Sequence, residues 1–302
     1  MIGSSGTTIP RKPQTVVTAQ IRGSAMNILD PQGPIGAAEK TILIDSVAIM
    51  LAIVLPTIVA VFGFAYWFRA TNAKARYLPD WAYSGRIELV VWSIPTLTII
   101  LLGGVAWIGA HQIDPAKAVE GSGKPLTIQA VSLDWKWLFI YPDRQVATIN
   151  TLTVPAGVPL RFELTSSSVM NVFFIPQFGS MIYTMNGMAT QLNLRADRPG
   201  TFQGLSAHFS GDGFPDMRFD VHVVPLEQFS KWAQEGSRAE KSLDEASYRE
   251  IAKPSTKGQP AIYHLADPQL FHAIVTQKLP PSPGFQAGVK GADLPAGGAD
   301  AR

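Results

Sequence analysis

The chain has 302 residues, of which 46% are hydrophobic and only 16% are charged, whereas soluble domains average about 25% charged residues. Its 25 lysines and arginines nearly balance 23 acidic residues, which excludes the concentrated positive charge typical of nucleic-acid binding. The chain contains no cysteine. This excludes disulfide frameworks, thiolate zinc sites, iron–sulfur clusters and cysteine nucleophiles.

Residues 1–40 are predicted to form an N-terminal arm outside the membrane. Arg11 and Lys12 resemble the basic start of a signal peptide, but the stretch VVTAQI that follows is too short and too weakly apolar. Two interpretations stay open: a loose extramembrane arm, or a natural start of the gene product that differs from Met1.

A transmembrane hairpin is predicted over residues 41–111. Two windows without an ionisable acid or base, about 46–68 and 89–110, account for the low charge of the chain. Each is long enough to cross a hydrocarbon core of about 30 Å at about 1.5 Å per residue. A helix in a soluble core would usually be shorter and would keep a polar stripe.

The connection between the two spans predicts how the hairpin is oriented. Positive residues in short loops stay on the cytoplasmic side of a membrane. From residue 69 to residue 86 the connection holds one acid, Asp80, against four cations: Arg69, Lys74, Arg76 and Arg86. Both termini, and everything after His111, are therefore expected on the outer side.

The remainder of the chain is predicted to form an external domain. Over residues 124–225, apolar and polar residues alternate in short runs between glycines and prolines, which favours antiparallel strands in a sandwich or Greek-key barrel. The apolar face of 226–252 predicts a helix, and we assign 226–278 to a C-terminal helical extension. Residues 279–302, rich in proline, glycine and alanine, are expected to be disordered.

The residues alone indicate no enzyme that acts by itself. The chain has no nucleophile elbow, no phosphate-binding loop, no dinucleotide fingerprint and no HExxH metal motif. One feature singled out is the glycine-rich segment GLSAHFSGDGFPDM around His208, which lies between two predicted strands.

Several motifs, in order along the chain, resemble subunit II of the haem–copper terminal oxidases. They are IELVVWSIP at the second span, DWKWLFIYP, VPAGVPLRFELTS and SVMNVFFIP. The resemblance covers about residues 29–277. It implies a membrane anchor of two helices that carries an external, cupredoxin-like all-β barrel.

Members of this family that accept electrons from cytochrome c hold a dinuclear copper centre in the barrel, and the resemblance locates its ligand positions here. Asn171 and Phe214 stand in place of the two histidines, Ser206 and Ser210 in place of the two cysteines, and only Met217 is kept. His208 falls where the family uses a backbone carbonyl. We call these six residues the vestigial copper positions. Because a serine hydroxyl is hard and neutral, whereas the copper pair needs soft thiolates, we expect no metal here, and Met217 is interpreted as a core residue.

This pattern of replacement resembles the quinol-oxidising branch, in particular subunit II of bo-type ubiquinol oxidases. The resemblance implies a non-redox subunit of a proton-pumping complex that oxidises ubiquinol and reduces O2 to water in a respiratory chain. Its partners would be subunit I, other subunits and membrane lipid, with ubiquinol met through the complex and no cytochrome c. The haems and the remaining copper would lie in subunit I. The location would be the bacterial inner membrane, with the β domain and both termini periplasmic.

Three further residues receive interpretations from the resemblance. In the family, a glutamate at the place of Glu88 helps to form the cytoplasmic proton entrance of subunit I, although a carboxylate at a helix N-terminus is also favourable by itself. Trp135 occupies the place where electrons from cytochrome c enter. Without copper there is no acceptor for these electrons in the barrel. Trp135 and Trp137 alternate with Lys136 on a predicted strand. We therefore expect both tryptophans to pack the barrel or the face toward subunit I.

Two other classes of function stay open. The chain could be a free membrane-tethered cupredoxin that transfers electrons, an interpretation that the missing cysteines and histidines oppose. It could also be a metal-free receptor or assembly module built on the same barrel.

Overall fold

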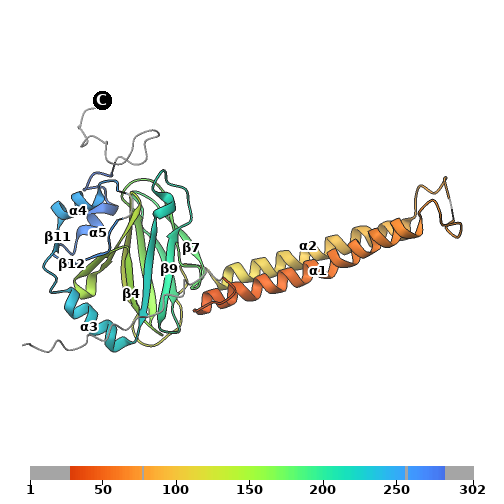
Figure 1. The fold of residues 1–302 in the computed structure, drawn as a ribbon. Helices are drawn as coiled ribbons and strands as arrows, with labels where there is room; N and C mark the ends of the chain where they lie inside the picture. The colour runs from red at the N-terminus through yellow and green to blue at the C-terminus, as the bar shows by residue number, and fades with distance from the viewer. Residues whose placement is uncertain (1–27, 77, 256–257, 283–302) are drawn as a thin grey trace, which may run out of the picture.

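The structure is a computed structural model that describes residues 28–76, 78–255 and 258–282. Two long helices, α1 (Pro34–Trp67) and α2 (Gly85–Gln112), run side by side away from a compact β domain (Figure 1). Both are long and apolar enough to cross a membrane. Gly109 of α2 allows the close approach of the two helices, because a Cβ there would lie 2.6 Å from Cδ1 of Ile42.

Both helices extend beyond the predicted spans at their N-terminal ends. α1 begins at Pro34 rather than near residue 46, and the end of the predicted 1–40 arm is therefore helical. α2 likewise begins at Gly85 rather than at residue 89. The charge-free windows mark only the most apolar part of each helix, whereas helical hydrogen bonds continue through charged residues such as Glu39. Residues 1–27 lie outside the described residues.

The external domain contains two sheets in which antiparallel pairs predominate. One sheet has the order β11-β12-β3-β2-β1-β5-β8 and the other β4-β10-β9-β6-β7. The strands are β1 (Leu126–Leu133), β2 (Lys136–Tyr141), β3 (Val146–Ile149), β4 (Thr151–Pro155), β5 (Pro159–Ser166), β6 (Asn171–Phe174), β7 (Met181–Thr184), β8 (Thr190–Arg195), β9 (Gly200–Ser206), β10 (Arg218–Val224), β11 (Ser242–Leu243) and β12 (Ala261–Leu265). Three pairs are parallel, β1 with β5, β4 with β10 and β11 with β12, which corrects the expectation of antiparallel strands throughout.

Two apolar runs that look like single strands are each divided in the structure. The run 126–137 turns at Asp134 and Trp135 into the β1–β2 hairpin, and Trp135 has a positive φ of 65°. Asn150, with φ of 52°, separates β3 in one sheet from β4 in the other. Asparagine tolerates this left-handed conformation, so the chain can cross between the sheets at that point.

The C-terminal extension is not purely helical, which corrects the prediction for 226–278. Its single expected helix is divided into α3 (Leu226–Gly236) and α4 (Glu245–Ala252), and α5 (Leu270–Val275) follows. Between them, β12 pairs with β3, and β11 pairs with β12. The extension thereby lengthens the larger sheet and lies against it (Figure 1).

The start of the predicted disordered tail is ordered. Leu279 is buried, and the backbone N–H of Ser282 donates to the carbonyl of Ser167 at 2.8 Å. The side chain of Ser282 also donates to the carbonyl of Ala252. These contacts hold residues 279–282 against the domain, and residues 283–302 lie outside the described part of the chain.

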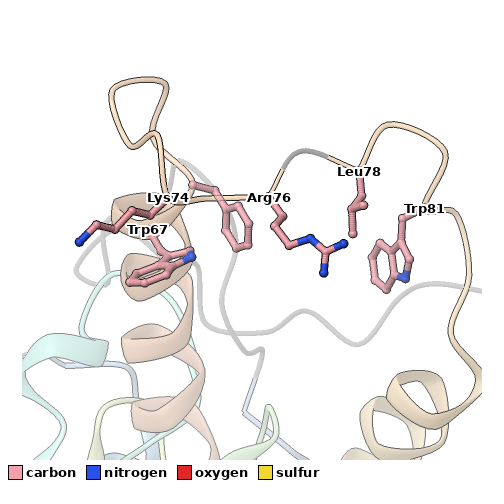
Figure 2. Close-up of a pocket in the computed structure, with 6 residues that line it drawn as sticks. Trp67, Lys74, Arg76, Leu78 and Trp81 are labelled. Carbon is pink, nitrogen blue, oxygen red and sulfur yellow. The ribbon is translucent and has the colours of Figure 1, made fainter.

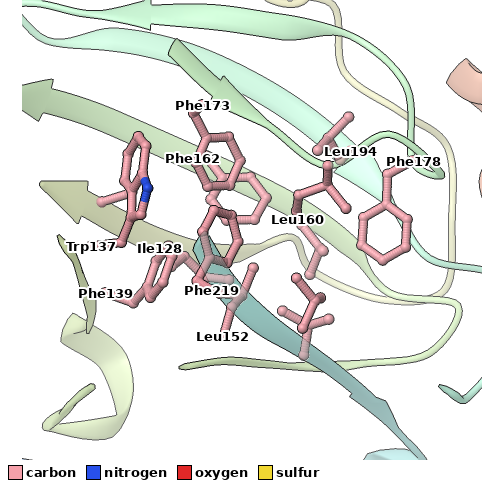
Figure 3. Close-up of a cluster of buried hydrophobic side chains, with 14 of the residues drawn as sticks. Ile128, Trp137, Phe139, Leu152, Leu160, Phe162, Phe173, Phe178, Leu194 and Phe219 are labelled. Atoms are coloured by element: carbon pink, nitrogen blue, oxygen red, sulfur yellow. The ribbon is translucent and has the colours of Figure 1, made fainter. Parts of the chain in front are cut away.

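Aromatic side chains fill the space between the two sheets. Trp137, Phe139, Phe173 and Phe219 contact one another with ring centroids 5.0–6.4 Å apart, and Figure 3 shows them converging from both sheets. A second cluster covers the other face of β1, β2 and β3, where the extension packs on Leu138 and Ile140. The run WLFIY in β2 is therefore buried on both faces.

Candidate functional site

The vestigial copper positions gather at one end of the barrel. Asn171 begins β6, Ser206 ends β9, and the loop 207–217 carries the others. Ser206 Oγ donates to Asn171 Oδ1 at 3.0 Å, and Ser210 Oγ donates to Met217 Sδ at 3.9 Å. Asn171, Ser206, Ser210 and Met217 are all buried, so these polar atoms satisfy one another inside the domain.

His208 and Phe214 lie at the margin of this cluster. Both are half-buried, and His208 packs its ring against Tyr183 at 6.0 Å. Phe214 contacts the exposed Phe209 edge-on at 5.7 Å. The imidazole and the phenyl ring thus make aromatic contacts.

The donors of the cluster match a dinuclear copper centre poorly. Two hydroxyls, an amide and a thioether are neutral, and only the thioether is a soft ligand. Within the described residues, no group of three or more histidine, aspartate or glutamate side chains is placed to hold a metal ion. Met217 is 1% exposed and belongs to the core cluster, where an unbranched thioether fills space.

Both tryptophans singled out in the sequence are buried in the barrel. Trp135 lies in the β1–β2 turn rather than on a strand, and its indole N–H donates to the carbonyl of Ser210 at 3.0 Å. Its ring lies on Gly213, where a Cβ would approach within 2.3 Å. Trp137 is fully buried among phenylalanines, and its Nε1 has no hydrogen-bond partner within the described chain. Trp135 therefore joins the hairpin to the loop of the vestigial copper positions.

Sequence reasoning missed two buried ionisable residues at this turn. Asp134 and Lys136 are 3% and 6% exposed. Lys136 Nζ donates to the carbonyl of Lys253 at 2.8 Å and to Ser255 Oγ at 2.7 Å. Burial lowers the pKa of Lys136 to about 8, although the charge of Asp134 opposes the shift. The one signal in the sequence is that the ionisable residues of DWKW stand inside an otherwise apolar run.

A second group of residues that the sequence did not single out joins α1 to the barrel. Glu39 Oε1 accepts hydrogen bonds from the backbone N–H of Ser180 at 2.7 Å and from its hydroxyl at 3.2 Å. The N–H of Gly36 donates to the carbonyl of Phe178 at 3.1 Å. Gly179, with φ of 85°, has no room for a Cβ, which would lie 2.6 Å from the nitrogen of Gly36. These contacts fix where the hairpin meets the domain.

Glu88 lies at the opposite end of the molecule. It is in the first turn of α2, where its backbone N–H donates to the carbonyl of Ser84 at 3.0 Å, and its side chain is exposed. The length of the hairpin separates it from the vestigial copper positions (Figure 1). The structure therefore does not bring these two sets of predicted site residues together.

Comparison with protein families gives two matches. Residues 142–224 match the model described as the periplasmic domain of cytochrome c oxidase subunit II. Residues 238–281 match the model described as the COX aromatic-rich motif. The first corresponds to most of the barrel and the second to the part of the extension that covers β1–β3.

Curated relatives match over most of the chain. Cytochrome bo(3) ubiquinol oxidase subunit 2 of Pseudomonas aeruginosa is 44% identical over 255 residues, which cover 84% of this chain and 77% of that protein. Ubiquinol oxidase subunit 2 of Acetobacter aceti is 42% identical over 259 residues, which cover 85% and 84%. Among solved structures, the periplasmic domain of cytochrome oxidase subunit II of Bradyrhizobium japonicum is 23% identical, covers 39% of this chain and 96% of its own, and gives a TM-score of 0.37.

Proposed function

The chain belongs to the ubiquinol oxidase subunit 2 family, and on that premise we propose how its hairpin and barrel serve the complex. It is subunit II of a ubiquinol oxidase, an oxidoreductase complex, and is anchored in a membrane by two helices. Two observations support this most directly. Two relatives are more than 40% identical in sequence over 84% and 85% of this chain, and serines stand at both thiolate positions.

The chain itself carries no redox centre in this proposal. Electrons from ubiquinol would enter subunit I within the membrane, where the haems and copper reside, and pass to O2. The barrel would serve assembly and support of subunit I rather than electron transfer. This is supported by the neutral donors of the vestigial copper positions, which hydrogen-bond to one another, and by Trp135, which donates to a backbone carbonyl.

Purification of the complex through a tag on this chain tests the proposal. A haem-bearing subunit should co-purify in detergent, and the preparation should consume oxygen with ubiquinol but not with reduced cytochrome c. The isolated chain should hold no copper. Stoichiometric copper in the chain would support the tethered cupredoxin instead, and failure to recover any haem-bearing subunit would support the receptor or assembly module.

The proposed orientation places the α1–α2 connection in the cytoplasm and the barrel in the periplasm of a bacterial inner membrane. It is supported by four cations, three in the connection and Arg86 in the first turn of α2. A cysteine introduced at Ser122 in the external linker should react with a membrane-impermeant reagent in intact cells freed of outer membrane. A cysteine at Asn72 should react only after lysis, and the reverse pattern would contradict the orientation.

Glu88 is proposed as part of the cytoplasmic proton entrance to subunit I. Its support is an exposed carboxylate at the cytoplasmic start of α2. Replacement by alanine should lower ubiquinol-driven oxygen consumption several-fold, whereas Asp80→Ala, which removes an exposed acid from the same connection, should leave it unchanged. Unchanged turnover in Glu88→Ala would remove the proton role.

A further inference from the structure

A hollow lies under the α1–α2 connection, at the end of the hairpin farthest from the barrel. Its volume is about 640 Å³. Its walls combine two cations with four large apolar side chains, namely Trp67, Phe68, Lys74, Arg76, Leu78 and Trp81. Figure 2 shows Arg76 extending below the loop between Trp67 and Trp81. The size lies within the range of about 300–1,000 Å³ found for small-molecule sites.

The two cations of the hollow are available to an anionic ligand. The ion pairs found among the described residues all lie in the external domain, so no described carboxylate lies within 4.0 Å of Lys74 or Arg76. The neighbouring Arg69 instead faces the Tyr66 ring, with its guanidinium carbon 4.2 Å from the centroid. Asp80, the one acid of the connection, does not line the hollow. The hollow therefore has net positive charge.

The position of the hollow at the ends of the two spans indicates which kind of anion could bind there. Trp67 is the last residue of α1, and Trp81 lies four residues before α2 begins at Gly85. Tryptophans at the ends of spans lie at the depth of lipid headgroups. The apolar walls therefore face the outer part of the acyl chains while the cations face the phosphates.

We propose that this hollow binds an anionic phospholipid of the cytoplasmic leaflet, with Arg76 on its phosphate-bearing headgroup, Lys74 adding positive charge at the rim, and the tryptophans against its glycerol and upper chains. The inference rests on the proposed membrane insertion and orientation. Arginine suits phosphate because its planar fork donates two parallel hydrogen bonds. A zwitterionic lipid would bring its own cation to the site and would bind less tightly.

The two cations also set the expected size of the effect. Each lysine or arginine near an anionic membrane surface adds to the attraction for anionic lipid. Their joint removal in K74Q/R76Q should weaken binding about 30-fold, which is about 2 kcal/mol at about 1.4 kcal/mol per tenfold change. The matched control K117Q/K124Q removes two exposed lysines from the external side of the second span and should bind as the wild type does.

Photo-crosslinking of the purified complex tests the proposal. The probe is phosphatidylglycerol with a diazirine near the headgroup, and adducts are mapped by mass spectrometry of peptides from residues 67–86. Labelling should occur in the wild type and the control and fall strongly in K74Q/R76Q. Unlabelled phosphatidylglycerol should compete, whereas phosphatidylcholine and inorganic phosphate should not.

The proposal would be overturned by the absence of an adduct in this segment or by equal competition from phosphatidylcholine. Competition by inorganic phosphate would also overturn it and would identify a free-phosphate site. A crosslink that instead shows another subunit covering these residues would also overturn it. If K74Q/R76Q fails to assemble, the competition series on the wild type still decides. Ubiquinol-driven oxygen consumption of the same preparation tests the proposed function separately, because an active complex without the adduct contradicts the lipid site alone.

Discussion

At the residue scale, Tyr141 shows how one hydroxyl joins two strands inside the barrel. The side chain is fully buried. Its hydroxyl donates to the carbonyl of Thr153 at 3.0 Å and accepts from the N–H of Thr153 at 2.9 Å. Burial raises the pKa of Tyr141 far above its ordinary value, so the hydroxyl stays protonated and keeps both bonds.

Replacement of Tyr141 by phenylalanine should destabilise the chain by about 1–3 kcal/mol, because both backbone groups of Thr153 lose their partner in a buried place. Denaturant unfolding in detergent, followed by fluorescence, measures the change. Tyr263→Phe is the control, since no hydrogen bond of its hydroxyl is found within the described residues, and its effect should stay within about 0.5 kcal/mol. Equal effects of the two variants would refute the role of the hydroxyl.

Lys136 predicts a pH dependence of stability. Its pKa is about 8 in the folded chain and ordinarily 10.5. Between these values the unfolded chain binds a proton that the folded chain lacks, so the free energy of unfolding rises with pH. Below pH 8 both states are protonated, and the cost of burying the charge is fully present.

The wild type should therefore gain stability relative to Lys136→Met as the pH rises from about 8 to about 10.5. Unfolding free energies measured at half-unit pH steps test this. Lys231→Met, which changes an exposed lysine of α3, should give a curve parallel to the wild type. A curve for Lys136→Met parallel to that of the wild type would show that burial does not lower the pKa of Lys136.

At the element scale, β9 and β10 are paired so closely that one glycine is obligatory. Gly204 lies opposite Phe219. A Cβ at Gly204 would lie 2.0 Å from Cζ of Phe219, and that ring is fixed by Trp137, Phe139 and Phe173. The ring cannot move without disturbing the whole aromatic cluster.

Gly204→Ala should accordingly cost about 1–3 kcal/mol through overpacking. The midpoint of thermal unfolding should fall, whereas Thr201→Ala, an exposed change on the same strand, should alter it little. Unchanged stability of Gly204→Ala would show that the Phe219 ring can move aside at little cost.

The extension accounts for the burial pattern that the alternation of residues does not predict. In β2, the odd-numbered Trp137, Phe139 and Tyr141 face the space between the sheets, and Leu138 and Ile140 face the extension. The continuous apolar run WLFIY is typical of a strand covered on both faces. The sequence nevertheless does not identify the segment that provides the second cover.

At the scale of the whole molecule, the contact between α1 and the barrel holds the two parts in one arrangement. Glu39→Ala should remove two hydrogen bonds to Ser180, which are charge-assisted and worth about 1.5–3 kcal/mol each at most. The expected result is faster proteolytic cleavage within linker residues 113–125 of the purified complex. Glu227→Ala, an exposed acid of α3, is the control, and equal cleavage rates would contradict a clamping role.

Much of this protein follows from its sequence alone, because the deciding signals are local. Charge-free windows identify the two helices, since a bilayer core excludes charge whatever the neighbours are. Serines at 206 and 210 identify the missing thiolates, because ligand chemistry depends on residue type. The barrel and membership of the subunit II family were predicted correctly and confirmed.

Only the tertiary structure decides what depends on distant partners. The strand pairing of the extension and the Glu39–Ser180 contact join residues that are far apart in the sequence. The turn at Trp135 and the burial of Lys136 depend on which segments cover them. The hollow beside Arg76 likewise depends on how the connection folds back between two helix ends. The zero cysteine count and the low charge can be read from composition. Packing decides which of the charged residues lie close together.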